Sequence, residues 1–581
     1  MAAFDTSPSS FTRPAAAGRS VPLLAFLVML AVLPLLLSVT IPQPIGPMFW
    51  DHYIYLDATN RIATGQVPNV DFFTPVGPLG YYLFYGLISA FPEGHPLLLS
   101  SWALLLVSAP LMALVVRDVQ ARSAALAVAL AVPFLFYSIL PFNSGDFYPY
   151  PGSDGFGIYN RQICQLLYVL AAGLLFVEQR SMRTAIVVLT MLALLFIKVT
   201  GVAAGTLLCL AAFATGRLPL RHALVAGILF FATIALLELS TGIPSAYLAD
   251  ILALLTVNDG SLLPRLLQAA SLNFGVVFFA VVLAVVLLVA DIPEIRARFA
   301  DLVRRRRLSD LSRLLDRPAL WLGAFLAAGI LFESQNTGSQ AFIFLWPLLL
   351  GIVLDQWRRR GARPLTIAVF ALALAAALPP LVTVTQKAGR AWIGAVNNQP
   401  IESHNLKTMG ATSVRPLIQL RADRLEQNYV THRDSYEDLT HSGELHSFLL
   451  FSDFDFQVIW LTALDKAIDA IRAYESAKGV HFRTIMNIDF TNPVPWLMER
   501  EAPKYIAIGA DPFRAVPPPT PQVAGAVGAV DLALLPTCPP ATSRQKLLDL
   551  YQPMLKKNHT RIRLTDCFDA FVRSDLAQAG R

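Results

Sequence analysis

The chain has 581 residues, of which 55% are apolar and 15% are charged. A soluble globular protein usually carries about 25% charged residues, so this composition excludes a protein whose whole surface faces water. The formal net charge of +6 does not indicate a nucleic-acid partner, because no nucleic-acid-reading motif accompanies the basic residues. The sequence therefore predicts a membrane protein.

Apolar runs close to the length of a membrane-spanning helix recur between residues 21 and 384 and then stop. The eleven runs are 21–41, 97–116, 123–140, 162–177, 184–197, 199–214, 222–239, 273–290, 319–332, 341–357 and 364–384. Charge density rises after residue 385. We therefore expect an N-terminal segment over 1–20, a polytopic α-helical membrane domain over 21–384, and a separate domain over 385–581.

Lysine and arginine residues fall almost entirely on one side of these spans. The loops on the N-terminal side hold 20 of them, and the opposite loops hold four: Arg61, Arg161, Lys198 and Arg265. Because basic loops remain in the cytoplasm, we expect the N-terminus and the four-arginine run at 304–307 to be cytoplasmic. An odd number of spans then places residues 385–581 outside the cytoplasm.

The outer side is predicted to carry two long loops, 42–96 and 141–161, and a soluble α/β domain. Residues 77–91 and the sequence SAYLADILALL within 240–272 predict short helices at the membrane interface. In the C-terminal domain, amphipathic patterns predict helices over 461–478 and 543–557. Patterns typical of strands cover 482–488, 503–509, 530–536 and 561–573.

Ionisable residues near the spans gather at their outer ends, and none lies in the middle of a span. Such groups are costly at membrane depth and are candidates for function. They are Asp51, Asp146, Asp154, Arg161, Lys198, Glu238 and Glu333. Each one alone is equally typical of an interface anchor or a turn-forming acid. The hypothesis of a polar pocket at the outer leaflet therefore depends on the whole set.

The first outer loop, MFWDHYIYLDATNRIATGQVPNVDFFTPVGPLGYYLFYGLISAF (48–91), resembles that of GT-C membrane glycosyltransferases. This superfamily includes protein O-mannosyltransferases, lipid A aminoarabinose transferases and sugar transferases of rhizobial lipopolysaccharide core. The matching features are Asp51, Tyr53 and Tyr55, Gly65 to Asp71, Gly77-Pro78-Leu79, and the lysine-containing hinge LLFIKVTGVAAG (194–205). The resemblance covers about residues 20–360. It departs in the second loop, which lacks a clear acidic pair, and in the C-terminal domain, which matches no known catalytic module.

The resemblance implies an inverting glycosyltransferase that moves a sugar from a polyprenyl-phosphate donor to a glycan, lipid or protein acceptor. The reaction would take place at the outer leaflet of a bacterial inner membrane. Asp51 is the favoured general base, because an acceptor hydroxyl must lose a proton. Asp57 is less favoured, since on a helix it would project about 120° away from Asp51. Lys198 and Arg161 are expected to bind the donor phosphate, as a point charge and a bidentate fork.

Further residues are expected to line the same pocket: Tyr53, Tyr55, Asp71, Asp154, Tyr159, Glu238 and Glu333. The sequence shows no metal-binding cluster, and the resemblance leaves a divalent cation open. Two other functions also stay open. One is a transporter or flippase of a lipid-linked glycan, although transporters usually place ionisable groups at the midplane of repeated halves. The other is a non-enzymatic assembly protein whose outer domain binds polysaccharide.

The cysteines divide between the two predicted domains. Cys164 and Cys209 fall within spans, whereas Cys538 and Cys567 are the only cysteines of the outer domain. An oxidising compartment favours disulfide formation, so we expect these two to pair. The alternative is a pair of separate buried thiols.

The distribution of basic residues predicts a topology that reporter fusions can test. We expect a reporter that works only outside the cytoplasm to be active when it is fused after residue 581. The reason is that the basic loops, which remain in the cytoplasm, lie on the opposite side of the membrane from the C-terminal domain. A C-terminal fusion to a reporter that works only in the cytoplasm serves as the matched measurement. Activity of that second fusion would contradict the predicted topology.

Overall fold

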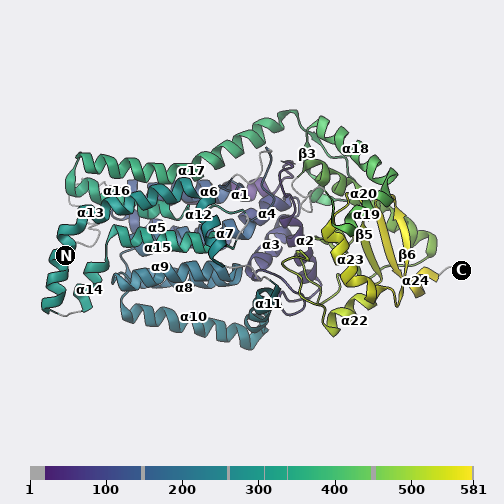
Figure 1. The fold of residues 1–581 in the computed structure, drawn as a ribbon, viewed down its shortest axis with the longest axis horizontal. Helices are drawn as coiled ribbons and strands as arrows, with labels where there is room; N and C mark the ends of the chain where they lie inside the picture. The colour runs from purple at the N-terminus through teal and green to yellow at the C-terminus, as the bar shows by residue number, and fades with distance from the viewer. Residues whose placement is uncertain are drawn as a thin grey trace.

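The computed structural model describes residues 20–145, 151–257, 262–305, 308–335, 338–445 and 453–578. Asp146 and two arginines of the basic run, Arg306 and Arg307, lie outside the described residues. The chain forms a long helical bundle with an α/β domain at one end (Figure 1). Helix α17, Pro364–Gly394, runs along the bundle and continues through the expected boundary at residue 385 toward the α/β domain.

Each predicted apolar run is helical over most of its length. The helices are α1 (Val21–Leu37), α4 (Pro96–Trp102), α5 (Leu105–Gln120), α6 (Ala124–Ile139), α7 (Ile158–Phe176), α8 (Arg180–Ile197), α9 (Val199–Ala214), α10 (Leu220–Thr241), α13 (Phe274–Arg305), α15 (Pro318–Glu333), α16 (Leu345–Arg360) and α17. By length and apolar composition, five helices of the described chain can cross a membrane, or up to seven if each bent pair is one span. Four further apolar helices are shorter, and the count of eleven spans stays a prediction.

The bundle has a buried centre and an apolar outer surface. Helix α7 lies inside, with nearly all of its side chains buried. Helix α10 lies outside and buries only Ala226, while Phe231 and Leu239 are 69% and 87% exposed. A soluble protein rarely exposes so continuous an apolar surface. The outer helices therefore fit a lipid environment, as their composition predicts.

The loops that were predicted to be cytoplasmic meet at the end of the bundle opposite the α/β domain, beside helix α14 (Leu308–Leu315) (Figure 1). Ion pairs join them to one another. Arg122 contacts Glu178 at 2.6 Å and Arg217 contacts Asp316 at 3.2 Å. The basic residues are thus segregated to one end of the bundle in space, as they are in the sequence.

Short helices form a layer between the bundle and the α/β domain. They are α2 (Asp51–Ala63), α3 (Leu79–Ala90) and α11 (Ile243–Val257), and a further helix, α12 (Leu262–Leu272), follows α11. Helices α3 and α11 correspond to the two interfacial helices predicted from the sequence. A small sheet ties this layer to the rest of the chain: β1 (Gln43–Pro44) pairs in parallel with β3 (Thr412–Val414), which pairs antiparallel with β2 (Gln399–Pro400).

The α/β domain is built on a four-stranded sheet of order β4-β5-β7-β6. Its strands are β4 (Ile485–Asn487), β5 (Leu532–Pro536), β6 (His559–Thr565) and β7 (Phe568–Arg573); β4 and β5 are parallel and the other pairs are antiparallel. The helices of this part are α18 (Pro416–Thr431), α19 (Arg433–Ser442), α20 (Phe454–Lys478), α21 (Val494–Met498), α22 (Pro521–Ala529), α23 (Thr542–Leu555) and α24 (Ser574–Gln578).

One strand prediction was wrong in part, and another was wrong. Residues 561–573 form a hairpin of two strands, β6 and β7, rather than one strand. Residues 503–509 form no strand, because Tyr505 has a φ of 66° and the segment bonds instead to the first outer loop. The Tyr505 N–H donates to the Asp71 carbonyl at 2.6 Å, and the Ile508 N–H donates to the Phe73 carbonyl at 3.1 Å.

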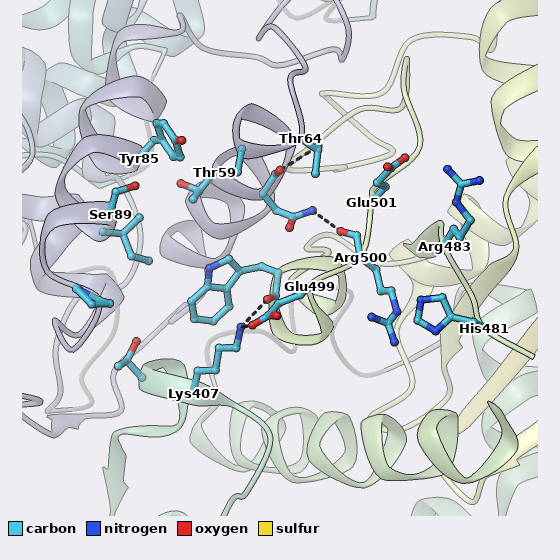
Figure 2. A pocket seen from close by; sticks show the side chains of 16 residues that line it. Thr59, Thr64, Tyr85, Ser89, Lys407, His481, Arg483, Glu499, Arg500 and Glu501 are labelled. Carbon is cyan, nitrogen blue, oxygen red and sulfur yellow. Dashed lines mark hydrogen bonds and ion pairs between the residues drawn. The ribbon is translucent and has the colours of Figure 1, made fainter. Parts of the chain in front are cut away.

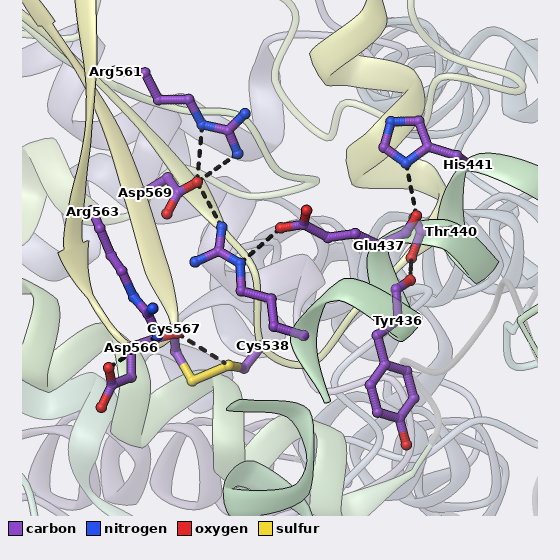
Figure 3. A network of polar contacts seen from close by, with 11 residues as sticks. Tyr436, Glu437, Thr440, His441, Cys538, Arg561, Arg563, Asp566, Cys567 and Asp569 are labelled. Atoms are coloured by element: carbon purple, nitrogen blue, oxygen red, sulfur yellow. Dashed lines mark hydrogen bonds and ion pairs between the residues drawn. A yellow bond between two sulfur atoms is a disulfide. The ribbon is translucent and has the colours of Figure 1, made fainter. Parts of the chain in front are cut away.

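A disulfide joins Cys538 to Cys567, whose Cα atoms are 4.8 Å apart. It connects the end of β5 to the turn of the β6–β7 hairpin (Figure 3). Beside it, Asp569 accepts hydrogen bonds from Arg561 and from Arg433 of α19. The covalent bond and this ion network fix the hairpin against the helices of the domain.

Replacing both cysteines by serine is expected to destabilise the α/β domain. Opening a loop of about 28 residues removes a constraint on the unfolded chain that is worth about 3 kcal/mol. Thermal unfolding of the purified double variant should therefore begin at a lower temperature than that of the wild type. The matched control replaces the free Cys209 by serine. Equal unfolding temperatures for wild type and double variant would contradict the expectation.

Candidate active site

Asp51 is held at the point where the two outer loops meet. It is the first residue of α2, and a carboxylate is favoured at a helix N-terminus. Its Oδ2 accepts a hydrogen bond of 2.7 Å from the Gly157 N–H, and its own N–H donates to the Gly155 carbonyl at 3.0 Å. Only 8% of Asp51 is exposed. The second loop therefore covers and orients this carboxylate.

Glycine makes this approach of two backbones feasible. A Cβ on Gly155 would lie 2.5 Å from the Phe49 Cα, and one on Gly157 would lie 2.5 Å from the Gly338 carbonyl oxygen. Gly157 also has a φ of +70°, a conformation that side chains disfavour. Glycine at these two positions therefore allows the backbone of the second loop to contact Asp51.

The surroundings of Asp51 have opposing effects on its charge. Burial raises the pKa of Asp51 to about 6. The Gly157 N–H, together with the positive charges of Arg161 and Lys198, acts in the opposite direction. A carboxyl group with this pKa is mostly ionised at neutral pH and is a better proton acceptor than an ordinary aspartate. These are the properties that a general base requires.

Lys198 lies in the break between α8 and α9. Its backbone is extended, and its Nζ donates to Asn160 Oδ1 at 3.2 Å and to the Gln335 carbonyl at 3.4 Å. The same Nζ lies 5.0 Å above the centre of the Tyr159 ring. The negative charge of Glu333 acts on Lys198, and Glu333 Oε1 accepts a hydrogen bond of 2.7 Å from Ser339. Lys198, Tyr159 and Glu333 therefore belong to one polar cluster with Asp51.

The break at Lys198 is stabilised by groups from other segments. The Gly77 N–H donates to the Ile197 carbonyl at 2.9 Å, and the Val199 N–H donates to the Tyr247 hydroxyl at 3.0 Å. A Cβ on Gly77 would lie 2.2 Å from the Phe196 carbonyl oxygen. The Gly77-Pro78-Leu79 sequence of the first loop is thus packed directly against the lysine hinge, which places both motifs of the family resemblance side by side.

Arg161 is buried and holds the second loop in place. Its Nη1 donates to Asn143 Oδ1 at 3.0 Å and to the Phe156 carbonyl at 2.9 Å. Its Nη2 lies 3.4 Å from both Ser101 Oγ and the Asp154 carbonyl. These contacts engage both terminal nitrogens of the guanidinium. Arg161 therefore acts on Asp51 through its charge while its hydrogen bonds serve the loop.

Asp154 is paired with a lysine that the sequence analysis did not select. Its Oδ2 accepts hydrogen bonds from the Asn143 N–H at 2.7 Å and from Lys387 Nζ at 3.0 Å. Lys387 belongs to α17, in the part of that helix beyond the predicted span. This ion pair is buried, since Asp154 is 1% exposed. It connects the second outer loop to the helix that leads to the α/β domain.

The predicted pocket tyrosines lie in different surroundings. Tyr55 contacts Tyr81 and Phe84, with ring centres 5.1 and 5.5 Å away. Burial raises the pKa of the Tyr55 hydroxyl, and the nearby charge of Asp51 contributes in the same direction. Tyr53 points elsewhere and stacks on Trp460 of α20, with ring centres 5.3 Å apart. Among the predicted pocket tyrosines, Tyr55 and Tyr159 are therefore the two on which the charge of Asp51 acts.

Three further carboxylates have partners away from this cluster. Asp71 accepts from Lys504 Nζ at 3.0 Å and from the Val67 N–H at 2.8 Å. Glu238 accepts from the Ser245 N–H at 2.9 Å, at the start of α11. Asp57 forms a buried ion pair of 2.9 Å with Arg61. The described structure thus brings together Asp51, Arg161, Lys198, Tyr55, Tyr159 and Glu333, and it places Tyr53, Asp71, Asp154 and Glu238 in structural contacts.

The α/β domain contributes a residue that sequence reasoning missed. The positive charge of Arg514, in the loop between α21 and α22, acts on both Asp51 and Lys198. Arg514 Nε donates to Asp511 Oδ2 at 2.8 Å. No local signal distinguishes Arg514 from other exposed arginines, because its place beside Asp51 arises only from the folding of the domain over the outer loops.

No group of three or more His, Cys, Asp or Glu side chains in the described ranges is arranged to hold a metal ion. The cluster around Asp51 offers a carboxylate with cations, rather than several carboxylates that converge. Its geometry suits the binding of an anionic group next to a base.

Comparison with known proteins gives the following picture. No protein-family model and no curated protein matches the sequence. Among solved structures, ArnT from Cupriavidus metallidurans in the apo state aligns with a TM-score of 0.40 and 13% identity, covering 98% of this chain and 100% of that chain. ArnT bound to undecaprenyl phosphate aligns with the same TM-score and coverage and 15% identity.

A second kind of protein is matched at lower similarity. The archaeal oligosaccharyltransferase AglB from Archaeoglobus fulgidus, in complex with an inhibitory peptide and a dolichol-phosphate, aligns with a TM-score of 0.22 and 12% identity. The alignment covers 95% of this chain and 74% of the AglB chain. No site residue of this chain is assigned from these matches.

The contacts of the two cations predict different consequences for their removal. Arg161→Ala is expected to lower the unfolding temperature by several degrees, because it leaves buried carbonyl and amide oxygens without a partner. Lys198→Ala is expected to lower it less, since fewer of its contacts are buried. Thermal unfolding in detergent measures both, with the exposed Arg415→Ala as control. If Arg161→Ala unfolds at the wild-type temperature, the structural role of Arg161 is wrong.

Proposed function

We propose that the chain is an inverting membrane glycosyltransferase. It transfers a sugar from a polyprenyl-phosphate donor to a glycan, lipid or protein acceptor of the cell envelope, at the outer leaflet. The observation that carries this proposal is the buried Asp51 carboxylate at the N-terminus of α2, held by a backbone N–H and influenced by the charges of Arg161 and Lys198. This arrangement supplies a base beside a site for an anionic leaving group.

The proton and the electron pairs move as follows. The acceptor hydroxyl gives its proton to Asp51 while its oxygen forms a bond to the anomeric carbon of the donor sugar. The bond from that carbon to the phosphate oxygen breaks, and the polyprenyl phosphate leaves with the electron pair. Because attack and departure occur on opposite faces, a single displacement inverts the anomeric configuration, as in single-step inverting glycosidases.

Lys198 has the position and charge to assist the departing phosphate. A phosphate leaves without a general acid, and its developing charge is stabilised by a fixed cation in a site that excludes water. Lys198 sits in a helix break, on a ring of Tyr159 and beside Asn160, so its ammonium group is oriented before the donor arrives. Glu333 and Ser339 complete the polar surroundings of this lysine.

The position of the site agrees with a lipid-linked donor. The Asp51 cluster lies at the end of the bundle that carries the α/β domain, next to helices with exposed apolar side chains. A polyprenyl chain can lie along such a surface while its phosphate reaches Lys198. Alternating access would use a site in the middle of the bundle, whereas the Asp51 cluster lies at one end of it.

Asp51→Asn is expected to reduce transfer by about 10² or more, since general-base catalysis contributes about this factor. The assay combines the purified protein with polyprenyl-phosphate sugar donors and membranes from a strain that lacks the gene. Wild-type transfer should rise with pH through about 6, the pKa of Asp51, and the residual activity of the variant should lose this dependence. Near-normal transfer by a folded Asp51→Asn protein would refute the assignment of Asp51 as the general base.

A stability measurement separates loss of chemistry from loss of folding. Burial raises the pKa of Asp51 from its ordinary value to about 6. Its contribution to stability is therefore present at low pH and is lost as pH rises through the folded pKa. At neutral pH Asp51→Asn should relieve a cost of at most about 3 kcal/mol, so its unfolding temperature should equal or exceed that of the wild type. The exposed Asp423→Asn is the matched control.

A further inference from the structure

A cavity lies between the outer helices and the α/β domain. Its volume is about 640 Å³, within the range of pockets that bind small molecules. One wall consists of residues of α2 and α3, and the other consists of segments 407–408, 481–483 and 496–501 of the C-terminal part. Figure 2 shows Thr59, Tyr85 and Ser89 on the first side and Lys407, Arg483 and Glu499 on the second. None of its lining residues belongs to the Asp51 cluster.

Polar atoms at this cavity are buried without a protein partner. Thr59 is 4% exposed, and its Oγ1 has no hydrogen-bond partner among the residues that the structure describes. The same holds for Thr408 Oγ1 and Arg500 Nε. Leaving a buried donor or acceptor unpaired costs about 1–3 kcal/mol. All three groups belong to residues that line this one cavity, so its walls carry polar groups.

The lining has the chemistry of a saccharide site. Trp496 is half-buried and, with Tyr85, offers apolar ring surface next to polar groups. Asn60 and Arg483 supply donors, and Glu499 and Glu501 supply acceptors. Lys407 Nζ lies 5.0 Å from the Trp496 ring centre and donates to Glu499 Oε1 at 3.1 Å.

The charges of this lining nearly balance. The lining holds the cations Lys407, Arg483 and Arg500 and the carboxylates Glu499 and Glu501. A strongly anionic headgroup would need an excess of cations, whereas a hydroxyl-rich ligand uses donors and acceptors in similar number. This mixture, with an indole beside it, favours a neutral or weakly charged sugar.

Helix α2 connects this cavity to the catalytic cluster. Asp51 begins the helix, and Thr59 lies eight residues later, about 12 Å along its axis. An oligosaccharide can extend over such a distance, whereas a single sugar cannot. A ligand that binds at Thr59 and also places a hydroxyl at Asp51 would therefore be an oligosaccharide.

We propose that this cavity binds the saccharide portion of the acceptor, and that the α/β domain thereby selects the acceptor. The proposal rests on the glycosyltransferase function proposed above. Trp496 is the anchoring surface, and the unpaired Thr59 hydroxyl is the buried hydrogen-bonding group.

Trp496→Ala in the full chain tests the site in two ways. With deletion-strain membranes as acceptor, the variant should raise the apparent KM for acceptor at least tenfold, with a smaller change in kcat and in the KM for donor. The water-soluble glycan released from those membranes by mild acid should bind to the wild type, measured by calorimetry, and at least tenfold more weakly to the variant. Trp496→Phe should recover most of the loss, and the exposed Trp357→Ala is the matched control.

The outcomes separate this inference from the proposed function. An unchanged acceptor KM in Trp496→Ala, while Asp51→Asn abolishes transfer, would overturn the saccharide site and leave the enzyme intact. Transfer that is insensitive to Asp51→Asn would instead remove the proposed function. Binding of phospholipid vesicles, but not of the released glycan, that depends on Trp496 would show a lipid headgroup site and would also overturn the proposal.

Discussion

The hydrogen bond from the Gly157 N–H to the Asp51 carboxylate is the contact on which the arrangement of the outer end depends. It joins the first outer loop to the second and compensates in part for the burial of a charge. Without it, the ionised carboxylate would lie in a region from which water is largely excluded, at a cost that a folded protein rarely accepts. The same contact orients the Asp51 carboxylate and helps to keep it ionised, so that it can accept a proton.

The α/β domain secures this arrangement from the other side. The first loop is bonded to it through the Arg61 guanidinium and the Pro503 carbonyl at 2.6 Å, through Asp71 and Lys504, and through the backbone of Tyr505. Strand β1 adds a short sheet with β3. Domain and loop therefore form one structure. A domain that matches no known catalytic module still acts on the site by holding the first outer loop and by adding the charge of Arg514.

The sequence predicted the helices well because apolar length and loop charge are local properties. It also selected Asp51 and Lys198, whose positions after the first span and between two spans are visible in the chain itself. It could not identify Lys387 as the partner of Asp154, because the two residues are 233 positions apart. Arg514 was missed for the same reason.

The strand predicted at 503–509 shows the limit of pattern reasoning within the domain. Its consecutive apolar residues, Tyr505 to Ile508, are typical of a short buried strand. The backbone groups of this segment nevertheless bond to Asp71 and Phe73 of the first loop. Tertiary contacts therefore decided the conformation of this segment. The ion pairs of Asp71 and Asp154 similarly turned two predicted pocket residues into parts of the scaffold.

Mass spectrometry of the lipid-linked sugars in whole membranes tests the central claim most directly. A strain that lacks the gene should accumulate a polyprenyl-phosphate-linked sugar. Restoring the wild-type chain should remove that lipid, whereas Asp51→Asn at equal abundance should leave it in place. If no lipid-linked sugar accumulates, or if Asp51→Asn removes it as the wild type does, the chain is not the glycosyltransferase that its outer site describes.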